Sequence, residues 1–234
     1  RKMPYEASRV PRPETEIAVL HDWKGVCGTN LAHAANLHKA FCMNFSLAAQ
    51  GRNVAFDFID ERLLAKAAVE DGRLATQLGR YRVIVVPGAA VLGREAWARI
   101  VAFARAGGRV IFAGPPPSVD DAGKDLTGTF ALLLGIAPIH ADAYDAWYRA
   151  SAPLPQSRPE RFDLVLPLSG PENQLEFDVE GEAHAVHSPD GNVVWFSGYE
   201  AHASVLARCR AWASAPVLCH SGSILWRLYR DSER

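Results

Sequence analysis

The sequence lacks the features that would tie it to a membrane or to nucleic acid. The formal net charge of its 234 residues is −1, which argues against a broad surface for nucleic acid or anionic lipid. No apolar run approaches the ~20 residues that a membrane-spanning helix needs. We see no signal-peptide pattern and expect a cytoplasmic protein. The chain begins Arg1-Lys2 rather than with Met, so we expect a processed product or a piece of something longer.

Cysteine is also scarce. The four residues Cys27, Cys42, Cys209 and Cys219 include no CxxC pair. They are too few for a disulfide scaffold, so buried free thiols are the simplest interpretation, although the sequence leaves their disulfide state open. What the chain does contain is apolar residues, at 49% against 22% charged, which is ordinary for a globular domain.

Residues 80–114 carry the clearest structural pattern. The β-branched run Val83–Val86 stops at Pro87-Gly88, and a helical pattern follows over residues 94–104. Gly107-Gly108 ends that helix, and Val110–Ala113 forms a second apolar run. This order predicts a buried strand, a helix and a second buried strand, which is a βαβ unit. Apolar runs without alternation favour a parallel sheet that is covered on both faces.

The preceding residues repeat this alternation. We expect a strand at Ile17–Leu20, and a helix at Leu31–Gln50 with Gly51 as its C-cap. The remaining elements expected before residue 140 are a strand at Asn53–Ile59, a helix that Asp60 caps and Glu61 begins, a helical piece at Val69–Leu78, and a helix around Phe130–Leu134 that Gly135 ends. This pattern predicts an α/β fold, a flavodoxin-like, doubly wound and mostly parallel sheet.

The outer segments differ in composition. Residues 1–15 contain three prolines among charges and indicate a linker or strap, and we expect residues 16–234 to form a single domain. Within it, residues 151–161 form a proline-rich excursion and residues 162–234 a β-rich second part. That part is expected to hold strands at Phe162–Leu168 and Gln174–Val179, a hairpin at 183–196 around Asp190-Gly191, a helix at Tyr199–Ala213 and a strand at Ile224–Tyr229.

Candidate binding residues lie where the predicted strands end. Parallel α/β sheets bind ligands outside the carboxyl ends of their strands. Asp22 and Trp23 follow the first strand, and Gly88 follows the central one, so these three residues define a candidate strand-end cleft for a small molecule or a sugar.

Other polar groups give weaker signals. His33 and His38 are five apart on a helix, which turns them away from a shared face, and His184 and His187 should point to opposite faces of a strand. The pair Asp120-Asp121 stands in a turn-rich loop and is interpreted as solvated. We therefore expect no metal site and no cofactor.

The central unit resembles one half of the active site of class I glutamine amidotransferases. In that family a Pro-Gly-Gly turn supplies oxyanion-hole amides, and the segment Val85–Ala89 is similar. The next strand of the family ends in a nucleophilic Cys, where this chain reads Ile111–Pro115. No side chain there can attack a carbonyl, so the mechanism is absent. A relocated nucleophile at Cys27, near His21, is an alternative.

A second resemblance spans residues 15 to 213. The order and spacing of several short motifs are similar to the trimerisation domain of family 42 glycoside hydrolases, which are bacterial β-galactosidases. The matching segments are Ile17–Trp23 with its Asp-Trp end, Phe56–Asp60, Tyr81–Pro87, Ala106–Phe112 with its double glycine, Leu133–Ile136 and Glu182–Gly198. The chain departs from the family in an extra segment near Lys66–Gln77 and at Gly25–Gly28.

This resemblance implies a non-catalytic, amidotransferase-like domain with no catalytic residue of its own. In the family the domain follows a catalytic barrel, which carries both catalytic carboxylates, and packs protomers into a ring. The resemblance therefore implies a homo-oligomer, with a trimer as the expected form, and a catalytic barrel elsewhere in a parent chain that hydrolyses O-glycosidic bonds.

Three functions remain open on the sequence. The first is an accessory, oligomerisation domain of a β-galactosidase-like glycoside hydrolase. The second is an enzyme of the amidotransferase-like superfamily that uses Cys27 as its nucleophile. The third is a small-molecule or sugar-binding module that uses the cleft near Asp22, Trp23 and Gly88.

Overall fold

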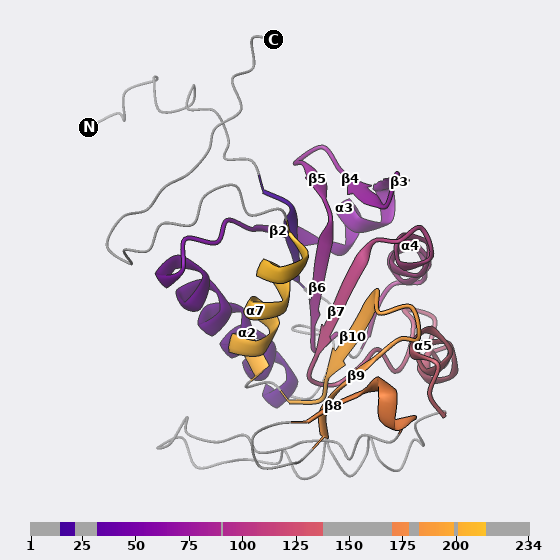
Figure 1. The fold of residues 1–234 in the computed structure, drawn as a ribbon. Helices are drawn as coiled ribbons and strands as arrows, with labels where there is room; N and C mark the ends of the chain where they lie inside the picture. Colours follow the sequence, from indigo (N-terminus) through magenta and orange to yellow (C-terminus); the bar gives the residue numbers. More distant parts are fainter. Residues whose placement is uncertain are drawn as a thin grey trace, which may run out of the picture.

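The fold is built around one seven-stranded sheet between two layers of helices (Figure 1). It is seen in a computed structural model that describes residues 15–21, 32–89, 91–137, 170–177, 183–198 and 201–213. For residues 32–37 it describes the helix backbone alone. The strand order is β2-β1-β6-β7-β10-β9-β8. Five of these strands are parallel, so the expected α/β class and mostly parallel sheet are confirmed.

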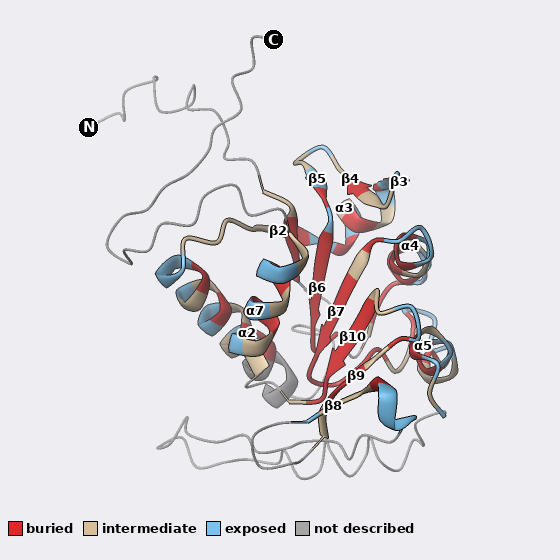
Figure 2. Ribbon diagram, in the orientation of Figure 1, coloured by how far each residue is buried: buried red, intermediate tan, exposed pale blue. Residues whose placement is uncertain are grey.

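The middle of the sheet is completely buried, as Figure 2 shows. The residues of β6 from Val83 to Val86 are at most 1% exposed. Full burial of each such side chain stabilises the fold by about 1.5–3 kcal/mol, which explains why these runs form the centre. The parallel strands are β1 (Ile17–His21), β2 (Asp57–Asp60), β6 (Val83–Pro87), β7 (Arg109–Ala113) and β10 (Val193–Phe196), followed by the antiparallel β9 (Ala183–His187) and β8 (Leu175–Phe177).

Helices cover both faces of the sheet, as expected for a doubly wound fold. One face carries α2 (Ala32–Gly51) and α7 (His202–Trp212), which pack on each other. The other carries α4 (Arg94–Arg105) and α5 (Thr127–Leu134), with the short α3 (Glu61–Lys66) beside α4 (Figure 1). A short 3₁₀ turn, η2 (Glu172–Gln174), precedes β8.

The helix ends largely follow the expected capping residues. The Asp60 side chain accepts a hydrogen bond from the Leu63 backbone amide at 2.8 Å, which caps α3. Gly135 ends α5 in the left-handed conformation, with φ of 69°. The prediction for Gly51 was wrong. Gly51 is the last residue of α2, and Asn53, with φ of 54°, makes the left-handed turn that follows the helix. The strand expected at Asn53–Ile59 begins later, because β2 starts at Asp57.

The predicted helical piece at Val69–Leu78 is wrong. The segment instead forms β3 (Ala68–Glu70) and β4 (Arg73–Ala75), which pair with β5 (Arg80–Tyr81) in a second, antiparallel sheet. The connecting residues Asp71 and Gly72 have φ of 49° and 67°. An Asp-Gly pair with two positive φ angles is the preferred two-residue hairpin turn, and that signal outweighs the helical spacing of the apolar residues.

The second part of the chain is confirmed where it is described. β9 and β10 form the expected hairpin, and the helix expected at 199–213 is α7. The strand expected at 174–179 is shorter, at Leu175–Phe177, with the 3₁₀ turn before it. The expected strands at 162–168 and 224–229, the excursion at 151–161 and the strap at 1–14 lie outside the described residues. None of the described helices is long and apolar enough to span a bilayer.

Candidate functional site

The sheet has a topological switch point between β1 and β6. The chain steps outward from β1 to β2 on one side and then returns to β6 on the other side. Ligands of doubly wound sheets bind at this point, outside the carboxyl ends of the strands. β1 ends at His21, and Gly88 follows β6. Of the predicted cleft, Gly88 is therefore at the switch point, while Asp22, Trp23 and Cys27 lie outside the described residues.

The backbone amide of Gly88 is already engaged. Gly88 is buried, with φ of 54°, and its N–H donates to the carbonyl of Ala113 at 2.8 Å. An oxyanion hole needs amides aimed at the oxygen of a substrate. This amide points instead into the end of the neighbouring strand, so the turn that resembles an oxyanion-hole segment lacks the free donor at Gly88.

The neighbouring strand end is equally closed. In the amidotransferase arrangement the nucleophile would stand near Ala113-Gly114. The Gly114 amide donates to the carbonyl of Phe196 at 2.9 Å, and its carbonyl accepts the indole N–H of Trp195 at 2.8 Å. Ala113 is fully buried. The corner is therefore joined to β10 by hydrogen bonds and packing, and it presents no reactive group.

A histidine fills the described part of the switch point. His38, on α2, is 3% exposed, and its Nδ1 lies 2.8 Å from the carbonyl of Pro87. The carbonyl can only accept, so Nδ1 carries the proton. Burial lowers the pKa of His38 below its ordinary value, more than the hydrogen bond to Pro87 raises it, and nearby His21 lowers it further. The ring is therefore neutral at pH 7.

Cys42 contacts the other ring nitrogen of His38, and it is not an activated nucleophile. Its Sγ lies 3.5 Å from His38 Nε2, one helical turn away. Because Nε2 is the unprotonated nitrogen, it accepts the S–H of Cys42. Burial raises the pKa of Cys42 to about 12. Catalytic cysteines have a lowered pKa and pair with a charged imidazole, so this pair has the opposite electrostatics.

Sequence reasoning overlooked the Cys42–His38 pair. The available signal was the i, i+4 spacing of the two residues on one predicted helix, which places them on the same face. Cys42 and Cys209, the cysteines within the described ranges, are both free thiols. Burial also raises the pKa of Cys209, which lies on the buried side of α7.

A groove of about 810 Å³ lies between α3 and the start of α4. Two of the carboxylates that line it accept hydrogen bonds from backbone amides. The buried Glu61 accepts the Gly93 amide at 2.8 Å, at the N-terminus of α4, and Asp60 caps α3. Three cationic side chains line the groove as well, those of Arg62, Lys66 and Arg94. The groove can thus accommodate a small polar molecule, but it lacks aromatic residues on which a sugar ring could stack.

Asp120 and Asp121 lie at the rim of this region, and Asp120 is not solvated as expected. It is 2% exposed, and its carboxylate accepts the amides of Ala122 and Lys124. Arg94 Nε donates to it at 3.2 Å. The Lys124 amide, with smaller contributions from Ala122 and Arg94, lowers the pKa of Asp120 below its usual range. Asp120 organises the loop between β7 and α5.

A second polar cluster joins β8, β9 and α7. Glu176 accepts a hydrogen bond from His187 Nε2 at 2.8 Å and lies 3.5 Å from His184 Nε2, and Arg208 pairs with it. The two histidines therefore meet at one carboxylate, although simple strand alternation predicts opposite faces. The cause is an irregularity of the β8–β9 register between Glu176 and Phe177. No group of three or more His, Cys, Asp or Glu side chains in the described ranges is placed to hold a metal ion.

The chain has no match among protein-family models or curated proteins. Solved structures do match. Gan42B, a GH42 beta-galactosidase from G. stearothermophilus, superimposes with a TM-score of 0.54 over 84% of this chain at 13% identity. The beta-galactosidase of the psychrophilic Marinomonas ef1 gives 0.50 over 88%, also at 13% identity. The fold is similar to part of these beta-galactosidases.

The extent of the match is as informative as its score. The chain spans 29% of the length of Gan42B and 30% of the Marinomonas protein, so less than a third of each. At 13% identity the similarity concerns the fold. This fold similarity agrees with the order of sequence motifs that resembles family 42 glycoside hydrolases.

Proposed function

We propose that this chain is a non-catalytic accessory domain of a glycoside hydrolase related to the GH42 β-galactosidases, and that it assembles with copies of itself. The observation that carries the proposal is the closed corner at Ala113-Gly114. An amidotransferase-like active site would be built there, yet the corner has no nucleophile and its amides are bonded to neighbouring strands. The fold similarity to less than a third of two β-galactosidases supports the same interpretation.

In this proposal the hydrolysis of O-glycosidic bonds belongs to a catalytic barrel of the parent protein. Retaining and inverting glycosidases use two carboxylates that flank the scissile bond. Three acidic residues of the two candidate regions are already engaged in other contacts. Asp60 caps α3, Glu61 accepts the Gly93 amide, and Glu176 is paired with Arg208 and His187. We also propose that residues 16–234 form one domain and that the oligomer is the trimer that the resemblance implies.

An activity assay tests the non-catalytic part of this proposal. The purified chain is expected to hydrolyse nitrophenyl β-galactoside no faster than buffer alone. Iodoacetamide labelling addresses the relocated nucleophile, because an activated thiol reacts faster than free cysteine. Labelling of Cys27 faster than free cysteine would favour the amidotransferase-like enzyme over an accessory domain. Reading the gene upstream of the codon for Arg1 should reveal a barrel with two catalytic glutamates.

A second candidate function is the binding of a small polar molecule. The groove between α3 and α4 favours it, since its volume is about 810 Å³ and Asp60, at the carboxyl end of β2, lines it. A thermal-shift series with galactose and lactose tests it, because a ligand that binds only the folded state stabilises it by RT ln(1 + [L]/Kd). A rise in melting temperature that Lys66→Ala removes would support binding in the groove, and an unchanged melting temperature would count against it.

A further inference from the structure

Three of the carboxylates along the groove between α3 and α4 are engaged by the backbone (Figure 1). Asp60 caps α3. Glu61 accepts the Gly93 amide and is only 8% exposed. The third, Asp121, accepts the Arg94 amide at 3.3 Å. Amides at the starts of two helices therefore offset part of the negative charge of these groups.

The cations of the groove are engaged far less. Arg62 and Lys66 are four apart on α3, which places both side chains on one face of that helix. Both are exposed, and neither pairs with a carboxylate among the described residues. Arg94 donates from Nε to Asp120 at 3.2 Å, and its two terminal nitrogens make no hydrogen bond to a described residue. Cationic donors are thus available on both walls of the groove.

Another cation beside the groove is buried without a counter-ion. Arg99, on α4, donates from Nη2 at 3.4 Å to the carbonyl of Ala65, which lines the groove. Its Nε is buried and has no hydrogen-bond partner, and no carboxylate of the described ranges forms an ion pair with it. A buried charge without compensation is costly, so this guanidinium favours an anion in the adjoining groove.

The start of α4 adds backbone donors to the same groove. Gly93 precedes this 12-residue helix and has no side chain with which to cap it. The amides of Glu95 and Ala96, in the first turn, belong to residues that line the groove and have no partner within the helix. A helix start attracts negative charge. The exposed carboxylate of Glu95 opposes this attraction, since no other described residue engages it.

We propose that this groove binds a phosphate monoester of a small polar molecule. A guanidinium group binds two oxygens of a phosphate at once, and the remaining oxygen is left for the ammonium of Lys66 or for the amides of α4. The volume of about 810 Å³ is typical of small-molecule sites and leaves room for the rest of the ligand. This inference rests on the binding of a small polar molecule, the second candidate function, and specifies the chemistry of that ligand.

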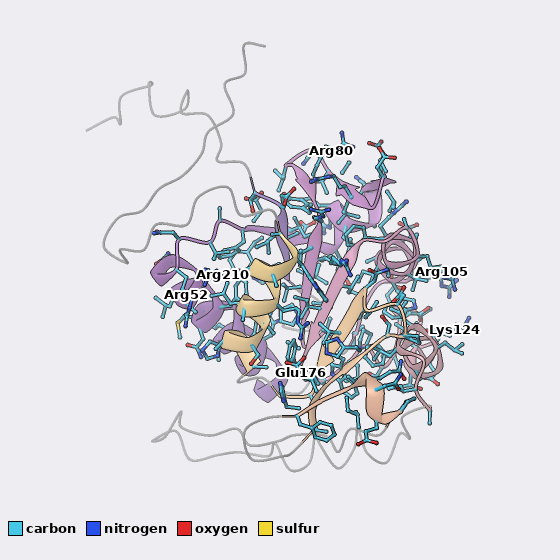
Figure 3. The ribbon with its side chains drawn as sticks, viewed as in Figure 1. Arg52, Arg80, Arg105, Lys124, Glu176 and Arg210 are labelled. Carbon is cyan, nitrogen blue, oxygen red and sulfur yellow. The ribbon has the colours of Figure 1, made fainter. Side chains whose placement is uncertain are left out.

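A thermal-shift titration at constant ionic strength tests the proposal, with galactose 6-phosphate and galactose as probes. The phosphate ester should bind at least about tenfold more tightly than the neutral sugar, because it adds charge-assisted hydrogen bonds. Arg62→Ala and Lys66→Ala should each weaken its binding about tenfold for the same reason. Arg52→Ala is the matched control, because Arg52 is an exposed cation next to α2, on the other face of the sheet (Figure 3). This variant should bind like the wild type.

Glu95→Gln gives a readout of the opposite sign. It removes the carboxylate that opposes an anion, so galactose 6-phosphate should bind more tightly to this variant than to the wild type. Weaker binding would mean that Glu95 holds the ligand, and would overturn the anion site. Inorganic phosphate should raise the melting temperature less than the monoester does, and an equal rise would overturn the assignment of a monoester.

The remaining outcomes separate this inference from the proposals on which it depends. Equal affinity for galactose and its phosphate would overturn the inference and leave the second candidate function standing. An affinity for the phosphate that Arg62→Ala and Lys66→Ala reduce no more than Arg52→Ala does would also overturn the inference, because it would reflect a general effect of the salt. An unchanged melting temperature with every probe would overturn both, while the accessory role would stand.

Discussion

Gly108 is the residue at which a single added carbon should matter most. It lies between α4 and β7, and a Cβ built there would come within 2.2 Å of the Phe103 ring, which is fully buried. The ring has no space to move in a packed core, so we expect Gly108→Ala to lower the free energy of unfolding by about 1–3 kcal/mol. Urea denaturation would measure it.

Gly128 provides the control for that substitution. It lies in the first turn of α5, and a Cβ there would meet nothing within 4 Å. Gly128→Ala should therefore leave the stability unchanged or raise it by up to about 1 kcal/mol, since alanine favours a helix. Equal losses of stability at both positions would contradict the packing described around Phe103.

Cys42 should be unreactive in the folded protein. Its pKa is raised to about 12, so almost no thiolate is present at pH 7 to 8, and the thiol is also partly buried. We expect iodoacetamide to modify Cys42 far more slowly in the folded chain than in urea, with mass spectrometry to identify each modified cysteine. Labelling of folded Cys42 at the rate of free cysteine would contradict the assigned pair with His38.

Among the elements, the edge strand β8 should depend on pH through Glu176. Burial would raise the pKa of Glu176, which is labelled in Figure 3. The hydrogen bond from His187 and the charges of Arg208 and the two histidines outweigh burial and lower the pKa below its usual range. A lowered pKa in the folded state stabilises the fold above the unfolded value of about 4.3 and loses that effect as the pH falls through the folded value.

Glu176→Gln tests this contribution. The wild type should be more stable than the variant at pH 7. The difference should shrink as the pH falls from about 4.3, where the carboxylate of the unfolded chain becomes protonated, through the lower pKa of the folded chain. Urea unfolding at several pH values measures it. A difference that is constant between pH 7 and pH 3 would show that the loss is one of packing rather than of charge.

Another test at this scale concerns the closed corner between β7 and β10. Trp195 is 2% exposed, and its indole N–H is the donor to the Gly114 carbonyl. Trp195→Phe keeps an aromatic ring but removes that donor, so we expect a loss of about 1–3 kcal/mol in the free energy of unfolding. Urea unfolding at pH 7 would measure it. A neutral result would mean that the hydrogen bond contributes little to holding this corner.

At the scale of the whole molecule, the sheet could be predicted from its apolar runs. The strands around Val83–Val86 and Val110–Ala113 are buried on both faces, and such strands need a continuous apolar sequence without alternation. The segment after α3 could not be predicted in the same way. The three short strands of the second sheet bury few residues each, so their burial gives no clear apolar pattern. The turn at Asp71-Gly72 determines the hairpin, and the helical spacing of the apolar residues led to a wrong prediction.

The candidate site was predictable only in its position. The strand ends follow from the order of elements, and Gly88 lies where the topology places a ligand. The hydrogen bonds of Gly88 and His38 could not be predicted from the sequence, because their partners come from distant parts of the chain. The cluster at Glu176 escaped prediction for a related reason, since an irregular register between two strands brings its histidines together.

Self-assembly of a chain without catalytic groups is the central claim, and sedimentation equilibrium of the wild-type protein tests it most directly. The account predicts a molar mass that is a whole-number multiple of the chain mass, at least two, and that persists on dilution through the micromolar range. A mass equal to one chain at every concentration would contradict it, because an assembly domain that does not assemble has no support from its fold alone.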